Sequence, residues 1–196
     1  TGWYHDQPDG PVYFGSVAYT YKGEMPENTV LALKPGTTSV APYYIFEHRT
    51  RTWEYEQPNL IGLVLPESCT RVEVNAFANC VNLRSIDLGG ARYIGDVAFN
   101  AHACEAIVLP DTVRYVDGNA FSGTALKAIH LNNGLRVLEE SAFFSYGAGK
   151  GVTVPESVTY LGTHCLGYYP PEPDDPFVGS ETIPGFVIYG ESGTAA

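Results

Sequence analysis

Apolar residues recur along this chain with a period of 22 positions. The dipeptide Ala-Phe occurs four times in equal steps, at Ala76-Phe77, Ala98-Phe99, Ala120-Phe121 and Ala142-Phe143. Cys165-Leu166 continues the series after a step of 23, and apolar residues stand eight and five positions before each Phe, as Val113 and Val116 do before Phe121. A fixed period of this length indicates stacked structural repeats, because one unit cannot bury its apolar face alone.

A second apolar pattern, Leu-x-x-Ile-x-Leu, lies between successive Ala-Phe pairs. Its copies are Leu60-Leu63-Leu65, Leu83-Ile86-Leu88, Cys104-Ile107-Leu109, Leu126-Ile129-Leu131 and the decayed Val152-Val154, in which a glycine replaces the first Leu. The last two apolar positions of each copy are two residues apart, which predicts a strand with one face turned inward. We expect these strands to stack in parallel, about 4.8 Å apart, as one ribbon. Each Ala-Phe pair is expected to form a helical turn.

The turn that follows each strand lacks the asparagine of the general leucine-rich pattern. That slot holds Cys69, Ala91, Val113, Leu135 and Val158. Because no asparagine side chain is available to pair with buried backbone groups of the turn, those groups need other partners. We therefore predict a second short strand in each coil, for example at Tyr93–Ile94 and Tyr115–Val116.

The segment Ile94-Gly95-Asp96-Val97-Ala98-Phe99 resembles the core of the BspA-like class of bacterial leucine-rich repeats, in which Ile-Gly-x-x-Ala-Phe precedes Leu-x-x-Ile-x-Leu-Pro. The resemblance covers about residues 28–168. It implies a right-handed leucine-rich-repeat solenoid, mainly β with short helical turns, of about six coils of 22–23 residues. It also implies a secreted or surface-displayed bacterial protein that acts in adhesion or protein binding.

The two ends of the chain depart from the repeat. Residues 1–27 predict a capping hairpin with Gly15-Ser16 as its turn, since the flanking residues are strong β-formers. Residues 28–168 hold the repeats, with an insertion at 47–58. Residues 169–196 begin with a proline-rich connector and supply a closing strand within 185–190. We expect a closing helix or a further module to follow in the full-length protein.

Composition excludes several functional classes. The 196 residues include 11 Lys and Arg against 22 Asp and Glu, giving a net charge of −11. Such an acidic chain does not suit nucleic acid, which requires a basic surface. The best apolar run, Leu60 to Leu65, is far shorter than the ~18 residues of a membrane span, so we expect no membrane insertion. No basic and apolar leader that would mark a signal peptide is present in this sequence.

No motif for catalysis, metal binding or cofactor binding is found. Gly-x-Ser-x-Gly, His-Glu-x-x-His and a phosphate-binding glycine loop are all missing, so we expect neither an enzyme nor a cofactor. Cys69, Cys80, Cys104 and Cys165 fall on repeat positions and are interpreted as inert core thiols. A disulfide between adjacent coils or a metal site is the alternative, but the nearby histidines lack the spacing of a zinc site.

Candidate partner-binding residues come from the outward positions and from the insertion. The insertion carries Arg51, Trp53 and Tyr55, whose residue types are common interface anchors; the alternative is a flap over the first coil. Two adjacent columns on the second strand hold Arg71, Tyr93, Tyr115 and Tyr160, and Arg92, Arg114 and Arg136. These columns are interpreted either as a self-stabilising ladder or as a patch for acidic or polysaccharide partners.

The outward positions of the Leu-x-x-Ile-x-Leu strands are small, which suits either a curved sheet or close approach of a partner. They are Gly62, Ser85, Ala106, Ala128 and Gly151.

The resulting functional hypothesis is a non-catalytic scaffold that binds a protein partner at a bacterial cell surface or outside the cell. The alternative is a carbohydrate-binding module associated with plant-cell-wall degradation, with Tyr93, Tyr115 and Tyr160 as stacking platforms along a polysaccharide.

Overall fold

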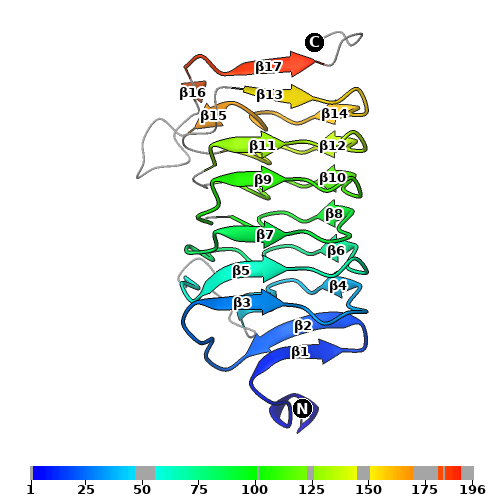
Figure 1. Cartoon of the computed structure of the whole chain (residues 1–196), viewed down its shortest axis with the longest axis vertical. Coiled ribbons are helices and arrows are strands. Elements are labelled where there is room, and N and C mark those ends of the chain that lie inside the picture. Colours follow the sequence, from blue (N-terminus) through cyan, green and yellow to red (C-terminus); the bar gives the residue numbers. More distant parts are fainter. Residues whose placement is uncertain are drawn as a thin grey trace.

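The chain winds as an elongated stack of coils from the N-terminus to the C-terminus (Figure 1). The computed structural model describes residues 2–46, 56–100, 102–122, 126–144, 151–169, 181–182 and 184–190. Its only α-helix in these ranges, α1, spans Gly2–His5. Two columns of strands run up the stack, with longer strands in one column and two-residue strands in the other.

The longer strands come from the Leu-x-x-Ile-x-Leu pattern and from two segments outside it. They are β3 (Thr29–Ala32), β5 (Leu60–Val64), β7 (Ser85–Asp87), β9 (Ala106–Val108), β11 (Ala128–His130), β13 (Gly151–Val154) and β17 (Val187–Gly190). All pair in parallel, but in three separate sheets, β3-β5-β7, β9-β11 and β13-β17. The expectation of one uninterrupted ribbon was therefore wrong among the described residues.

The inward residues of the longer strands are unevenly spaced along the chain, and both interruptions fall at steps that differ from 22 residues. The steps along Leu63, Ile86, Ile107, Ile129 and Val152 are 23, 21, 22 and 23 residues. The interruptions fall at the step of 21, between β7 and β9, and at the later step of 23, between β11 and β13. The first step of 23 keeps its pairing between β5 and β7. Coils that are one residue longer or shorter than 22 therefore differ on the side of the stack that carries the longer strands.

The short strands form the continuous sheet instead. They are β4 (Ser39–Val40), β6 (Arg71–Val72), β8 (Tyr93–Ile94), β10 (Tyr115–Val116), β12 (Val137–Leu138) and β14 (Tyr160–Leu161). With β1 (Gly10–Phe14) and β2 (Val17–Lys22) they make an eight-stranded sheet in the order β1-β2-β4-β6-β8-β10-β12-β14. The predicted second strand in each coil is confirmed. Regular 22-residue steps from Val72 to Leu138 keep this column in register.

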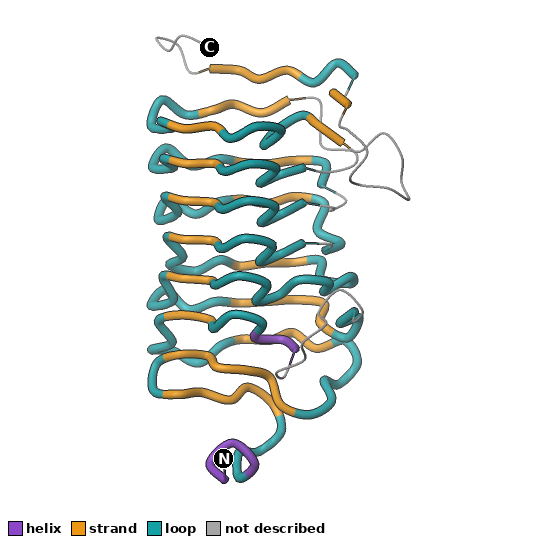
Figure 2. Tube along the Cα trace, turned by 180° about the vertical axis from the view of Figure 1, so that it is seen from behind, coloured by secondary structure: helices purple, strands orange, loops and turns teal. Residues whose placement is uncertain are grey.

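A third ladder of backbone hydrogen bonds joins the coils at the turn before each Phe. The residue two positions before the Phe donates its N–H to the next coil, as Asn75 does to the Asp96 carbonyl (3.0 Å) and Asn119 to the Glu140 carbonyl (3.1 Å). Phe99 likewise donates to the Ala120 carbonyl (2.8 Å). At the slot that lacks asparagine, the backbone N–H instead bonds within its own turn, as Cys69 does to the Pro66 carbonyl (2.8 Å) and Val113 to the Pro110 carbonyl (3.0 Å). Figure 2 shows these loops stacked in register.

The turns of this ladder require an unusual backbone conformation. A left-handed φ between 51° and 57° recurs at Tyr43, Asn75, Val97, Asn119, Ser141 and His164. Asparagine tolerates this region, whereas a β-branched side chain is strained there, so Val97 is the outlier. The helical turn expected at each Ala-Phe pair is a 3₁₀ turn, η1, only at Tyr44–Phe46. The equivalent segments of the following coils are hydrogen-bonded turns.

The core is a row of stacked rings at the centre of the coils. Phe77, Phe99, Phe121 and Phe143 are fully buried. Their centroids are 5.5, 5.3 and 5.1 Å apart and their planes are within 9° of parallel. Tyr44 extends the row at 5.5 Å from Phe77 with a tilted ring. The single evenly spaced row that a 22-residue repeat predicts is thereby confirmed.

The described residues outside the repeats pack against the two ends of the stack. At the N-terminal end, β1 and β2 form an antiparallel hairpin with Gly15 and Ser16 between them. At the C-terminal end, β17 pairs in parallel with β13. Two further short strands, β15 (Tyr168–Tyr169) and β16 (Glu181–Thr182), pair antiparallel beside it.

Candidate interaction surfaces

The outward residues of the eight-stranded sheet form one continuous column. Parallel pairing aligns Val17, Ser39, Arg71, Tyr93, Tyr115, Val137 and Tyr160 across successive strands. This is the column expected from the repeat register. Arg71, Tyr93 and Tyr115 are adjacent, whereas Val137 separates Tyr115 from Tyr160. We refer to Arg71, Tyr93 and Tyr115 as the tyrosine stack.

Side chains of the tyrosine stack contact one another along the axis of the solenoid. The Arg71 guanidinium lies 4.2 Å from the centre of the Tyr93 ring. The rings of Tyr93 and Tyr115 are stacked, with centroids 5.4 Å apart and planes 28° from parallel. Because Arg71 and Tyr115 come from the strands on either side of β8, both faces of the Tyr93 ring are covered.

Carboxylates one coil further along hold the tyrosine hydroxyls. Tyr93 donates to Asp117 (2.6 Å) and Tyr115 to Glu139 (2.5 Å). Burial, followed by the bond to Asp117, raises the pKa of Tyr93 to about 12. The pKa of Tyr115 is also raised, chiefly because its hydrogen bond to Glu139 favours the protonated phenol. Both phenols therefore stay protonated and serve as donors.

The carboxylate partners were missed from the sequence, although the repeat carries a signal for them. Each acceptor lies 24 residues after its tyrosine, which is one repeat plus two positions. Two positions along a strand point to the same face. Arg71 pairs with an acid only two positions away in its own coil, where its Nε lies 2.8 Å from Glu73. A search for acids two positions after each outward residue would have found Glu73, Asp117 and Glu139, but it would have assigned Asp117 to Tyr115 of the same coil instead of Tyr93 of the preceding one.

A second column, one position earlier in each coil, contains three exposed arginines. We call Arg92, Arg114 and Arg136 the arginine row. Arg114 donates its backbone N–H to the Arg92 carbonyl, and Arg136 donates to the Arg114 carbonyl, both at 2.9 Å. Thr70 and Thr159 continue the column at its two ends through equivalent bonds. The structure therefore stacks the three arginines in consecutive coils.

Arg51, Trp53 and Tyr55 of the insertion lie outside the described residues. Their proposed role in binding a partner, like the alternative of a flap over the first coil, stays a prediction.

The outward face of the longer strands carries small side chains and little charge. Its central column holds Val30, Gly62, Ser85, Ala106, Ala128, Gly151 and Val187, aligned by the strand pairings of the three sheets. The next outward column is Ala32, Val64, Asp87, Val108, His130, Thr153 and Tyr189. Val30 and Val108 are 62% and 64% exposed, which shows that little of the described chain covers this face.

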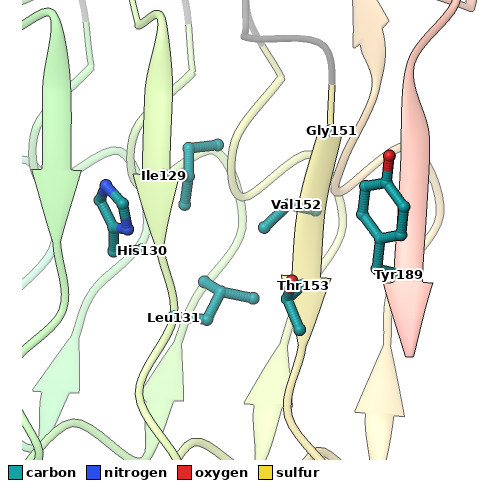
Figure 3. A pocket seen from close by; sticks show the side chains of 7 residues that line it. All are labelled: Ile129, His130, Leu131, Gly151, Val152, Thr153 and Tyr189. Atoms are coloured by element: carbon teal, nitrogen blue, oxygen red, sulfur yellow. The ribbon is translucent and has the colours of Figure 1, made fainter. Parts of the chain in front are cut away.

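A groove of about 390 Å³ opens on this face where the pairing between β11 and β13 is interrupted. Ile129, Leu131 and Val152 contribute apolar surface to it, and His130, Thr153 and Tyr189 contribute polar groups. Figure 3 shows Ile129 and Leu131 between the two strands, with Tyr189 beside β17. The groove coincides with the decayed fifth copy of the strand pattern, which is the signal that the sequence offers for it.

The cysteines are buried free thiols, as interpreted from the repeat. Burial raises the pKa of Cys69 and Cys165 to about 11 and that of Cys104 to about 12, so the unreactive thiol form dominates at neutral pH.

Neither a metal centre nor a membrane-spanning helix is found in the part of the chain that the structure describes. No group of three or more His, Cys, Asp or Glu side chains in this part is arranged to hold a metal ion. No helix in the same part is long and apolar enough to cross a membrane.

Comparisons with known proteins agree with this architecture. A family model described as BspA type leucine rich repeat region matches residues 51–169 in six copies. Among solved structures, a leucine-rich repeat protein from Bacteroides ovatus ATCC 8483 aligns with a TM-score of 0.58 and 20% sequence identity. The alignment covers 70% of this chain and 34% of that protein, and at this identity it concerns the fold alone. A search of curated proteins found no match.

Proposed function

Because this chain belongs to the BspA-type leucine-rich repeat family, we propose that it is a non-catalytic scaffold that binds a protein partner. The observation that carries the proposal is the surface of the eight-stranded sheet, where arginine and tyrosine side chains are held in register over successive coils. Arginine and tyrosine are the residue types most often found at the energetic centres of protein interfaces. Side chains already fixed by stacking lose little entropy when a partner binds.

The proposed setting is the bacterial cell surface or the extracellular space. Proteins of this family are typical of such locations, and the net charge of −11 suits a solvated surface protein. We further propose that residues 1–27 cap the first coil and that residues 169–196 close the last one. The hairpin is supported by edge-on contacts of the Trp3 ring with Phe14 (5.7 Å) and Tyr19 (6.1 Å).

Stacking of a polysaccharide on the tyrosine column is less well supported. A sugar ring binds to the open face of an aromatic ring, and both faces of Tyr93 are covered by its neighbours. Tyr160, 51% exposed at the end of the column, is the better placed of the tyrosines but stands apart from the stack. We therefore place protein binding first.

The test begins with the immobilised chain and extracts of bacterial surfaces and of host extracellular matrix. Captured proteins are identified by mass spectrometry, purified and measured again by biolayer interferometry as binary complexes. Saturable binding that is weakened in Trp53→Ala/Tyr55→Ala or in Tyr160→Ala would support the scaffold and locate its surface. Saturable binding that is unchanged in both variants would support the scaffold function but show that the binding surface lies elsewhere on the chain.

Two further assays address the alternatives. Retarded migration in gels that contain soluble plant polysaccharides, without any saturable protein partner, would favour the carbohydrate-binding module. Turnover of general esterase, protease or glycosidase substrates above the buffer control would overturn the non-catalytic assignment. We expect neither result.

A further inference from the structure

We propose that the arginine row, Arg92, Arg114 and Arg136, binds an acidic segment of a protein partner that lies along the axis of the solenoid. This inference rests on the proposed scaffold function and specifies the chemistry of its partner.

Backbone bonding sets the geometry of the row. Each arginine donates its backbone N–H to a carbonyl of the preceding coil at 2.9 Å, so consecutive α-carbons are separated by about the 4.8 Å spacing of paired strands. All three residues are exposed, and Thr70 and Thr159 bound the row at its ends. Three positive side chains therefore occupy one short line on a chain whose net charge is −11.

None of the ion pairs found among the described residues involves the row. Arg71 pairs with Glu73 and Lys127 with Glu105, yet the row has no carboxylate partner in the same part of the chain. Like charges in adjacent strand positions repel one another, so leaving three of them together without counter-charges is unfavourable. An external carboxylate at each position would remove that repulsion.

Backbone carbonyls position the guanidinium groups of Arg114 and Arg136 while most of their N–H donors stay free. Arg114 donates from Nη1 to the carbonyls of Asp111 (2.5 Å) and Val113 (3.0 Å), and Arg136 donates from Nη1 to the Ser157 carbonyl (3.2 Å). A guanidinium has five N–H donors, so a planar edge of each group is still able to bind a carboxylate. Arg114 and Arg136 are thus preorganised by neutral acceptors that do not cancel their charge.

A glycine beside the row permits this arrangement. A Cβ atom at Gly134 would lie 2.1 Å from Nη1 of Arg114, so any larger residue would push the guanidinium off the turn.

Charge complementarity favours an acidic partner and makes its position specific. Acidic residues outnumber basic ones two to one over the whole chain, so an acidic segment is repelled by the net charge and attracted where positive side chains gather, as in the row. A protein segment fits better than an anionic polysaccharide, because the neighbouring Tyr93 has no free ring face for a sugar.

The experiment measures binding of a fluorescein-labelled octaglutamate peptide to the whole chain by fluorescence anisotropy, at low and at physiological ionic strength. The test variant is Arg92→Gln/Arg114→Gln/Arg136→Gln. Arg84→Gln is the control, because Arg84 is also exposed and lies next to β7, outside the row. The thermal unfolding of both variants is compared with that of the wild type to show that they fold.

We expect the triple variant to bind octaglutamate at least about tenfold more weakly, with less dependence on salt, and the control to match the wild type. A triple Arg→Lys variant should retain part of the affinity, since lysine keeps the charge without the planar fork. Equal affinity in the triple glutamine variant, or an equal loss in Arg84→Gln, would overturn the inference. So would binding of polygalacturonate, but not octaglutamate, through the row.

Failure here is distinguishable from failure of the scaffold. If a captured protein partner binds the triple variant as tightly as the wild type, the scaffold function is supported and the arginine row is rejected as its binding site. If octaglutamate binds through the row but no protein partner binds saturably, the arginine row is supported as an anion-binding site and the scaffold function is rejected.

Discussion

Replacement of Phe99 by leucine tests whether ring stacking, beyond simple burial, stabilises the coils. Phe99 is fully buried and stacks on Phe77 at 5.5 Å and on Phe121 at 5.3 Å. Each such pair contributes about 0.5–1.5 kcal/mol beyond area burial, so losing both costs about 1–3 kcal/mol. Leucine retains most of the buried apolar volume, and the change of shape adds less than about 1.5 kcal/mol.

Phe143→Leu is the matched variant, because Phe143 is equally buried but has one stacked phenylalanine neighbour, Phe121 at 5.1 Å. The two substitutions lose the same atoms, so their difference isolates one stacked pair. We expect Phe99→Leu to lower the free energy of unfolding by about 1 kcal/mol more than Phe143→Leu does.

Urea unfolding, followed by circular dichroism, measures the free energy and its dependence on denaturant for each variant. Unchanged denaturant dependence would show that the same surface unfolds in all three proteins. Equal losses for the two variants, or a larger loss for Phe143→Leu, would refute a contribution from stacking and leave burial alone as the source of stability.

Two further predictions concern the turn ladder and a buried histidine. Val97→Asn should raise the free energy of unfolding by about 1 kcal/mol, because asparagine tolerates the φ of 56° there. Asn119→Val should lower the free energy of unfolding by a similar amount. Thermal unfolding of both variants measures these changes, and changes of the same sign would refute the prediction. Burial lowers the pKa of His102 from 6.5 to about 3. Because protonation then favours the unfolded chain, stability should fall as the pH drops below about 6.5, by about 1.4 kcal/mol per pH unit, until the pH reaches the folded pKa. His102→Asn should remove this dependence in urea unfolding at about pH 6.5 and about pH 5, and an unchanged slope in that variant would contradict the assignment to His102.

Much of the architecture was predictable because repeat spacing translates directly into position. The 22-residue step that recurs from Phe77 to Phe143 requires one stacked row, and the structure has that row. The same reasoning located the second strand and the column that aligns Arg71, Tyr93 and Tyr115. Local periodicity suffices for such features, because each coil repeats the environment of the last.

Contacts between columns were less accessible from the sequence. The pairing of Tyr93 with Asp117 and of Tyr115 with Glu139 depends on which way each side chain leans between coils. The groove beside Ile129 depends on how a 23-residue step is accommodated, since the same step between β5 and β7 preserves the pairing.

The amino-acid sequence alone thus determined the solenoid, its period and the identity of its outward columns. Only the tertiary structure decided which side of the coil carries the unbroken sheet. It also decided which arginines pair with carboxylates, as Arg71 does, and which do not, as in the arginine row. The physical reason is that burial of apolar residues follows the repeat. Backbone pairing and charge pairing instead depend on ångström-scale distances between coils, and a change of one residue in loop length alters those distances.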